Sequence, residues 1–350
     1  NLKIIPTESP VYDNVWSYVV PLAITLLLYQ CNIKKIWKES GKLLIIFFLS
    51  AAGTMIGAIV GFKLLQGKIP YLAEVAAMMT GSYIGGGANF AAMSAAFDTP
   101  GDVVSATVVS DNLLMALYFF ILIAIPSMSF FRKHFLHPHV DEVEGQEIKE
   151  GETAASSYWT HKDISLKDLA LSIGSAFVIV AVSTSIASFL SSAIPTSNSF
   201  LSILNTLLGN QYLIITTVTM ICASIFSNFF SNLGGAQEIG TYLIYIFFVV
   251  IGVPASIQSI IMNSPLLLVF CFVVVLINML VTFICAKLFK FNLEEAILAS
   301  NACIGGPTTA AALAIAKGWQ AMVVPALLVG TLGYVIGNYY GIFIGTFLGR

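Results

Sequence analysis

Three consecutive glycines, Gly85, Gly86 and Gly87, stand inside a long apolar stretch of the sequence. Glycine weakens a helix and lets another backbone approach closely, because it has no side chain. Backbone groups that a broken helix leaves unpaired are tolerated at membrane depth only where protein buries them or where they line a watery cavity. The stretch therefore predicts an interrupted helix whose break faces the inside of a membrane protein.

The composition of the whole chain supports a membrane location. Of the 350 residues, 57% are hydrophobic and 10% are charged, whereas soluble domains average about 25% charged residues. The formal net charge of −2 gives no indication of nucleic-acid binding. The cysteines are scattered without the spacing of a metal or redox site, so we interpret them as small apolar residues. We predict an all-α polytopic membrane protein.

The sequence around the glycines recurs in the second half of the chain. Ile84 to Gly87 reads Ile-Gly-Gly-Gly, and Ile304 to Pro307 reads Ile-Gly-Gly-Pro. In the same register, Val-Val-Ser-Ala at 103–106 matches Val-Val-Pro-Ala at 323–326. Such self-similarity indicates an internal duplication. We therefore divide the chain into a first transmembrane repeat (1–131), a hydrophilic cytoplasmic linker (132–167) and a second transmembrane repeat (168–350).

The two copies are expected to be inverted in the membrane. The loop Cys31–Lys42 is rich in lysine, whereas the matching loop Ala255–Ser264 has no charged residue. Positively charged loops stay on the cytoplasmic side, so the two loops are expected on opposite sides. Inversion requires one re-entrant element in each copy, and the glycine-broken segment is the natural choice. Broken helices that cross the membrane fully remain the alternative.

The second copy also contains two spans that lack a counterpart in the first. These are Leu169–Ala193 and Tyr212–Phe230. We therefore expect two further spans to precede residue 1.

Inverted repeats with interrupted helices are typical of secondary transporters, whose sites lie near the bilayer midplane. The half-helices after the two breaks would direct free N–H groups and positive dipole ends at the centre, which favours an anion such as a carboxylate. The predicted substrate-binding residues are Gly86, Gly87, Ala88, Asn89, Asn301, Gly306, Thr308 and Thr309. The alternative is that the glycines only allow neighbouring helices to cross at close distance and bind no ligand.

One acid, Asp111, lies inside the span that follows the first break. It is about 15 Å from the start of that helix, close to the bilayer middle, where a carboxylate is costly and marks a candidate functional site. We predict ion coupling at Thr107, Ser110, Asp111 and Asn112, with Na⁺ and H⁺ both open. Apart from a Na⁺ ion near Asp111, no metal or cofactor is expected. A structural carboxylate bonded to a neighbouring helix is the alternative.

The hydrophilic linker contains every histidine of the chain, including the cluster His134, His137 and His139. This cluster has metal-binding spacing, but a solvated linker is the favoured interpretation. Glu294, at the membrane edge, is also expected to be solvated. An intramembrane enzyme is disfavoured because no histidine lies within a span. An ATPase is not indicated either, because the sequence contains no P-loop motif.

Three motifs carry a resemblance that extends over essentially the whole chain. They are Gly-Ser-Tyr-Ile-Gly-Gly-Gly-Ala-Asn (81–89), Ser-Asp-Asn (110–112) and Ile-Gly-Gly-Pro-Thr-Thr-Ala-Ala-Ala (304–312). With them the chain resembles the YjcL-like family of bacterial integral membrane proteins, catalogued as a domain of unknown function. The paired Gly-Gly tips are more distantly similar to the glutamate:sodium symporters and the 2-hydroxycarboxylate transporters. That resemblance implies inverted repeats, re-entrant hairpins that meet at the midplane, and a scaffold that forms a homodimer.

The resemblance does not carry a substrate, because Pro307 and the third glycine, Gly87, depart from those families. The sequence predicts an ion-coupled symporter for a small carboxylate-bearing solute, such as an organic acid, an amino acid or a short peptide. It is expected to be a multi-pass protein of the bacterial inner membrane, surrounded by lipid. A cation/proton antiporter is the alternative, and an intramembrane enzyme is less favoured.

Overall fold

The computed structural model describes residues 9–145, 164–195, 201, 205, 208–252 and 257–349. Within these residues the regular structure is helical, without a strand, which confirms the predicted fold class. In the same residues, six helical segments are long and apolar enough to cross a membrane. They are Pro10–Gln30, Gly41–Leu65, Gly101–Ser127, Leu166–Ala193, Pro265–Leu288 and Ala321–Leu348.

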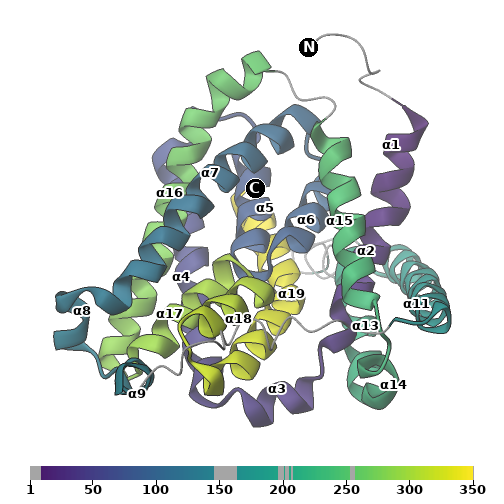
Figure 1. The fold of residues 1–350 in the computed structure, drawn as a ribbon. Coiled ribbons are helices and arrows are strands. Elements are labelled where there is room, and N and C mark those ends of the chain that lie inside the picture. Colours follow the sequence, from purple (N-terminus) through teal and green to yellow (C-terminus); the bar gives the residue numbers. More distant parts are fainter. Residues whose placement is uncertain are drawn as a thin grey trace.

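The first half of the chain runs through a series of helices that contains the predicted break (Figure 1). These are α1 (Pro10–Asn14), α2 (Val20–Leu27), α3 (Ile33–Glu39), α4 (Gly41–Leu65), α5 (Leu72–Gly85), α6 (Gly87–Ala96), α7 (Gly101–Ala124), α8 (Ser129–His134) and α9 (Pro138–Gly145). Helix α3 lies within the segment expected to be a lysine-rich loop. Asn32 caps it, because its side chain accepts a hydrogen bond from the Lys35 N–H at 3.2 Å.

The second half follows the same order near its end, with a broken helix pair before a long final helix. Its helices are α11 (Leu166–Ala193), α13 (Gln211–Ile225), α14 (Ser227–Ser231), α15 (Ala236–Gly252), α16 (Ile257–Leu288), α17 (Leu293–Ile304), α18 (Pro307–Ala316) and α19 (Gln320–Leu348). In Figure 1, α5 and α6 lie above α17 and α18, and α19 contacts both pairs. The inversion of the two repeats across a membrane stays a prediction.

Two ridges of glycines bring helices into close contact. On α4, a β-carbon at Gly57 would lie 2.8 Å from the Cα atom of Val274, so only glycine fits against α16. On α19, a β-carbon at Gly337 would lie 3.0 Å from the carbonyl oxygen of Gly81 on α5. The ridge on α4 therefore packs against the backbone of α16. The glycines on α19 allow α5, the first part of the first broken helix, to pack closely against it.

Three segments differ from the sequence prediction. Helix α16 begins at Ile257, inside the expected loop Ala255–Ser264, and contains Pro265. Proline is tolerated inside a membrane helix because neighbouring groups satisfy the freed carbonyl, so it does not mark the helix start here. The expected span Tyr212–Phe230 is divided at Phe226 into α13 and α14.

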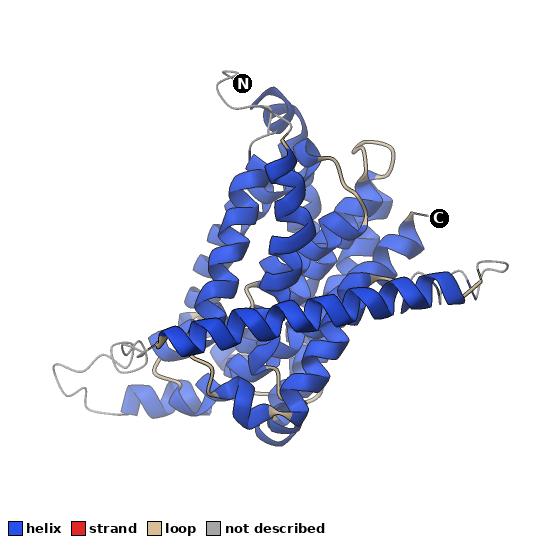
Figure 2. Cartoon of the chain, turned by 90° about the vertical axis from the view of Figure 1, so that its right-hand side faces the viewer, coloured by secondary structure: helices blue, strands red, loops and turns tan. Residues whose placement is uncertain are grey.

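The third difference concerns α11. This helix has the length of a span, but it lies across the other long helices instead of alongside them (Figure 2). Most of residues 194–210, as well as His161 of the linker, lie outside the described residues.

Candidate functional site

Each glycine break consists of one residue with positive φ. Gly86 has φ 86° and ψ −171°, and Gly306 has φ 83° and ψ −176°. This region of conformational space is essentially restricted to glycine. The two matching sequence positions therefore adopt the same backbone conformation, and the conformation explains why both are glycine.

At each break the chain turns back on itself. A β-carbon at Gly81 would lie 2.9 Å from Cγ of Met93, although these residues would be about 18 Å apart in a straight helix. In the second pair, Thr309 Oγ1 donates to Asn301 Oδ1 at 3.0 Å, where a straight helix would separate the two residues by about 12 Å. Thus α5–α6 is one helical hairpin, with tip 1 at Gly85–Gly87. The α17–α18 pair is a second, with tip 2 at Gly305–Pro307.

Both tips lie against one turn of α19. A β-carbon at Gly330 would lie 2.8 Å from Cβ of Pro307 in tip 2. A β-carbon at Gly333 would collide with the carbonyl oxygen of Ile84, which precedes tip 1. Gly330 and Gly333 are about 4.5 Å apart along the helix axis. The tips are therefore neighbours in space, as the sequence led us to expect.

The helices that leave the two tips have uncapped N-termini. Neither α6, which starts at Gly87, nor α18, which starts at Pro307, receives a side-chain cap from the described residues. The first N–H groups of a helix have no partner inside it, so those of Gly87, Ala88, Thr308 and Thr309 remain available. Gly87 is partly exposed and Thr308 is exposed. Together these groups form a candidate anion site.

The predicted amide donors are already engaged. Asn89 Nδ2 donates to the Tyr334 carbonyl oxygen at 2.7 Å and to Asn338 Oδ1 at 2.8 Å, which uses both hydrogens. Asn301 Nδ2 donates to the Thr309 carbonyl oxygen at 3.2 Å. Both asparagines are buried. They hold the hairpins in place, and the donors left for a ligand include the backbone groups at the tips and the exposed hydroxyl of Thr308.

The four predicted ion-coupling residues do not converge. Thr107 donates to the Val103 carbonyl at 2.8 Å and Ser110 donates to the Ala106 carbonyl at 3.0 Å, both within α7. Asn112 is exposed on another face of the helix. Asp111 interacts with Tyr83 on α5.

Asp111 lies beside the hydroxyl of Tyr83 and close to tip 1. Tyr83 is fully buried, and the two side chains interact. Among the described residues, however, neither Asp111 Oδ1 nor the Tyr83 hydroxyl has a hydrogen-bond partner. Phe119 on the same helix meets Gly305 in tip 2, about 12 Å further along the axis. Helix α7 thus contacts both hairpins, with its acid next to the first.

The described part of the linker docks against the base of the second hairpin. Glu294 Oε1 accepts a hydrogen bond from the Val140 N–H at 2.8 Å, and Glu294 is fully buried. Its expected solvation is therefore wrong, because α9 covers it. Arg132 pairs with Glu144, which lowers the pKa of the Glu144 carboxyl. No group of three metal-binding side chains comes together in the residues described, although His137 contacts Asp141 at 2.9 Å.

Comparison with known proteins identifies the family of the chain. A family described as "Protein of unknown function (DUF819)" matches residues 1–350. The chain belongs to this family. The DUF819 chain is also 52% identical over 345 residues to "Uncharacterized membrane protein YjcL" of Bacillus subtilis (strain 168), covering 99% of this chain and 85% of that protein. The resemblance to the YjcL-like family is confirmed, and the distant similarity to symporters stays a prediction.

In this DUF819 chain, sequence reasoning missed two buried asparagines. Asn278 Nδ2 donates to the Ser50 carbonyl at 2.8 Å, and its Oδ1 accepts from Ser300 Oγ at 2.9 Å. Asn338 Nδ2 donates to Thr216 Oγ1 at 2.9 Å. Both are amides inside apolar spans. A polar side chain in such a span is a signal that could have identified them from the sequence.

Proposed function

We propose that this protein is a secondary active transporter, an ion-coupled symporter for a small carboxylate-bearing solute. The observation that supports it is the pair of uncapped helix N-termini, at Gly87 and Pro307, held against one turn of α19. We interpret the hairpins as re-entrant elements whose tips form the solute site. In this scheme the protein performs no covalent chemistry and is not an enzyme.

The charge at the tips favours an anion with one carboxylate. Neither 84–90 nor 304–310 contains a charged residue, so the positive field comes from the backbone. Each helix N-terminus is equivalent to about +0.5 elementary charge, and two such ends supply about +1. Two helix ends therefore match one carboxylate, with the exposed hydroxyl of Thr308 as an additional donor.

Asp111 is the proposed coupling residue, with Na⁺ or H⁺ as the ion. An oxygen that is buried without a partner gains by binding a cation or a proton. The same observation supports the second candidate function, a cation/proton antiporter, in which Asp111 acts without any solute. The two differ in whether a solute moves together with the ion.

The proposed setting is the bacterial inner membrane, with a homodimer as the assembled form. The exposed apolar side chains of α11, among them Phe177, Val178 and Phe189, support a surface covered by lipid or by a second copy.

A thermal-shift screen tests the proposed ligand class. Purified protein is heated with small carboxylates, amino acids and short peptides, with and without Na⁺. Each acid is paired with its uncharged amide as the control. A ligand that binds the folded state raises stability by RT ln(1 + [L]/Kd), so at least one carboxylate is expected to raise the melting temperature and its amide is not. Equal effects of acid and amide, or no effect from any acid, would contradict the proposal.

A further inference from the structure

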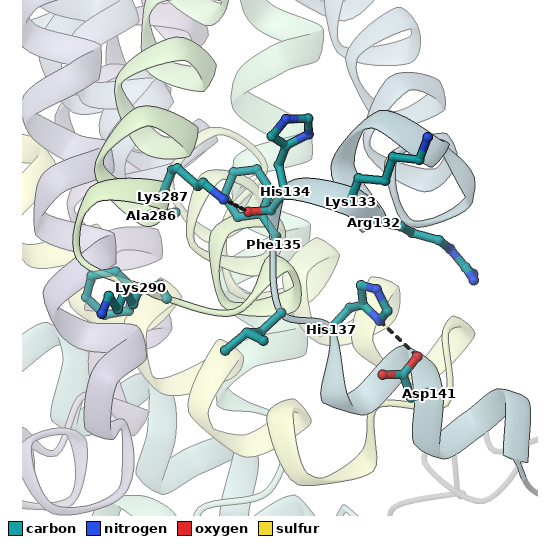
Figure 3. A pocket seen from close by; sticks show the side chains of 11 residues that line it. Arg132, Lys133, His134, Phe135, His137, Asp141, Ala286, Lys287 and Lys290 are labelled. Carbon is teal, nitrogen blue, oxygen red and sulfur yellow. Dashed lines mark hydrogen bonds and ion pairs between the residues drawn. The ribbon is translucent and has the colours of Figure 1, made fainter.

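A basic pocket lies at the end of two candidate spans. It has a volume of about 510 Å³ and lies between the α8–α9 segment and the end of α16 (Figure 3). Its basic side chains are Arg132, Lys133, His134, His137, Lys287 and Lys290. Among the lining residues the only acid is Asp141, which contacts His137 at 2.9 Å. The pocket therefore carries a clear excess of positive charge.

Several of these charges have no acidic partner. In the described part of the chain, no carboxylate lies within 4.0 Å of the ammonium groups of Lys133, Lys287 or Lys290. Lys287 donates instead to the carbonyl oxygen of His134 and lies 5.6 Å from the centroid of the Phe135 ring. Arg132, in contrast, is paired with Glu144. Unpaired lysines at one pocket favour an anionic ligand.

Lys290 lies at the turn that ends α16. Lys290 has φ 57°, in the left-handed region. The Phe291 N–H donates to the Ala286 carbonyl at 2.9 Å, which makes Lys290 the left-handed residue that ends α16. Glycine is the usual residue at such a position. This turn places Lys290 directly after α16, where it lines the pocket.

The surroundings of the pocket indicate a lipid. The candidate spans Gly101–Ser127 and Pro265–Leu288 end next to it. Beside the pocket lining at the end of α16, Ile284, Leu288 and Phe289 expose apolar side chains, with Leu288 70% exposed. A phospholipid has matching chemistry, because its acyl chains cover an apolar helix face while its phosphate lies at the level of the helix ends.

We propose that this pocket binds the phosphate group of an anionic phospholipid, with Lys287 and Lys290 as its main contacts. The lipid would bridge the linker segment α8–α9 and the end of α16. Because α9 covers the base of the second hairpin through Val140 and Glu294, bound lipid would fix the linker against that hairpin. The site is separate from the two tips and does not depend on the identity of the solute.

Native mass spectrometry of the full protein tests this assignment. The protein is titrated with phosphatidylglycerol and, separately, with phosphatidylcholine. The test variant is Lys287→Gln/Lys290→Gln, and the matched control is Lys34→Gln/Lys38→Gln, which removes two exposed lysines from α3 at the same end of the molecule (Figure 1). Lys287→Arg/Lys290→Arg keeps the charge and checks that the fold tolerates substitution.

The wild type is expected to bind phosphatidylglycerol more tightly than phosphatidylcholine. The Gln double variant is expected to lose about 30-fold in affinity, since each lysine near a membrane surface contributes about a fivefold attraction. The control is expected to retain most of its affinity, and the Arg variant to bind as the wild type does. Equal losses in test variant and control would overturn the site. Inorganic phosphate and glycerol 3-phosphate are titrated in the same way, and their binding without any preference for anionic lipid would overturn the lipid as the occupant.

Discussion

Asn89 Nδ2 lies 2.8 Å from Oδ1 of Asn338, and this hydrogen bond joins the first hairpin to the last helix. Asn338 in turn donates to Thr216 Oγ1 on α13 at 2.9 Å. Because all three side chains are buried, none can replace a lost partner with bulk water. The position of tip 1 therefore depends on an amide that lies five residues after Gly333 and eight residues after Gly330, the two glycines on α19 that contact the tips.

Replacing Asn338 is expected to loosen this contact. Asn338→Ala leaves one Asn89 hydrogen and the Thr216 hydroxyl without this partner, at a cost of about 1–3 kcal/mol. Thermal unfolding in mild detergent should show a lower melting temperature. Asn112→Ala, at an exposed asparagine on α7, should leave it unchanged. Equal melting temperatures for wild type and Asn338→Ala would show that the hydrogen bonds do not hold the hairpin.

A methyl group at Gly330 is expected to separate tip 2 from α19. In Gly330→Ala the new β-carbon would lie 2.7 Å from the Pro307 nitrogen, so the hairpin must shift. Overpacking of this kind costs about 1–3 kcal/mol and displaces the N–H groups that we assign to the ligand. The screened carboxylate should then no longer raise the melting temperature.

The matched control is Gly174→Ala on α11, where, apart from its chain neighbours and the nearby backbone of α11, no atom of the described residues lies within 4 Å of the new β-carbon. This change should be neutral, or stabilising by up to about 1 kcal/mol, because alanine favours the helix. Ligand stabilisation that survives Gly330→Ala at full size would remove the α19 contact from the site.

Asp111→Asn separates a coupling role from a structural one. If Asp111 binds the ion, the variant should fold normally and lose ion-dependent uptake. Na⁺ coupling predicts that sodium stabilises the wild type in proportion to ln(1 + [Na⁺]/Kd) and that the variant loses this effect. H⁺ coupling predicts no sodium effect, and a pH dependence of uptake that disappears in the variant.

Asp98→Asn is the control, since it removes the same charge from an exposed position before α7. It should transport as the wild type does. Unchanged ion-dependent uptake by Asp111→Asn would exclude the acid from coupling, and a lower melting temperature without loss of coupling would assign it a structural role.

The sequence predicted the breaks well because their cause is local. The low helix propensity of a run of glycines does not depend on distant parts of the chain. The matching motifs therefore predict the same backbone conformation at Gly86 and Gly306. The partners of Asn89 and Asn301 were not predictable in the same way. Hydrogen bonds over large sequence separations depend on helix packing, so two expected ligand donors are instead bound to the protein.

The sequence predicted helix boundaries and helix directions less well than it predicted the breaks. The segment Ala255–Ser264 was expected to be a loop, yet α16 begins at Ile257 and continues through Pro265. The apolar composition of α11 predicted a span but contained no information on the direction in which the helix lies. The burial of Glu294 depends on α9, a helix of the linker that hydrophilic composition did not predict.

Solute uptake into proteoliposomes tests whether the two tips form a carboxylate site that operates in transport. Vesicles with purified wild type, Gly330→Ala or Gly174→Ala receive a labelled carboxylate from the screen under an imposed Na⁺ or H⁺ gradient. We predict that wild type and Gly174→Ala concentrate the solute until the gradient is dissipated, and that Gly330→Ala does not. Movement of Na⁺ or H⁺ without any solute, or accumulation by Gly330→Ala at the wild-type rate, would contradict a carboxylate site formed by the two tips.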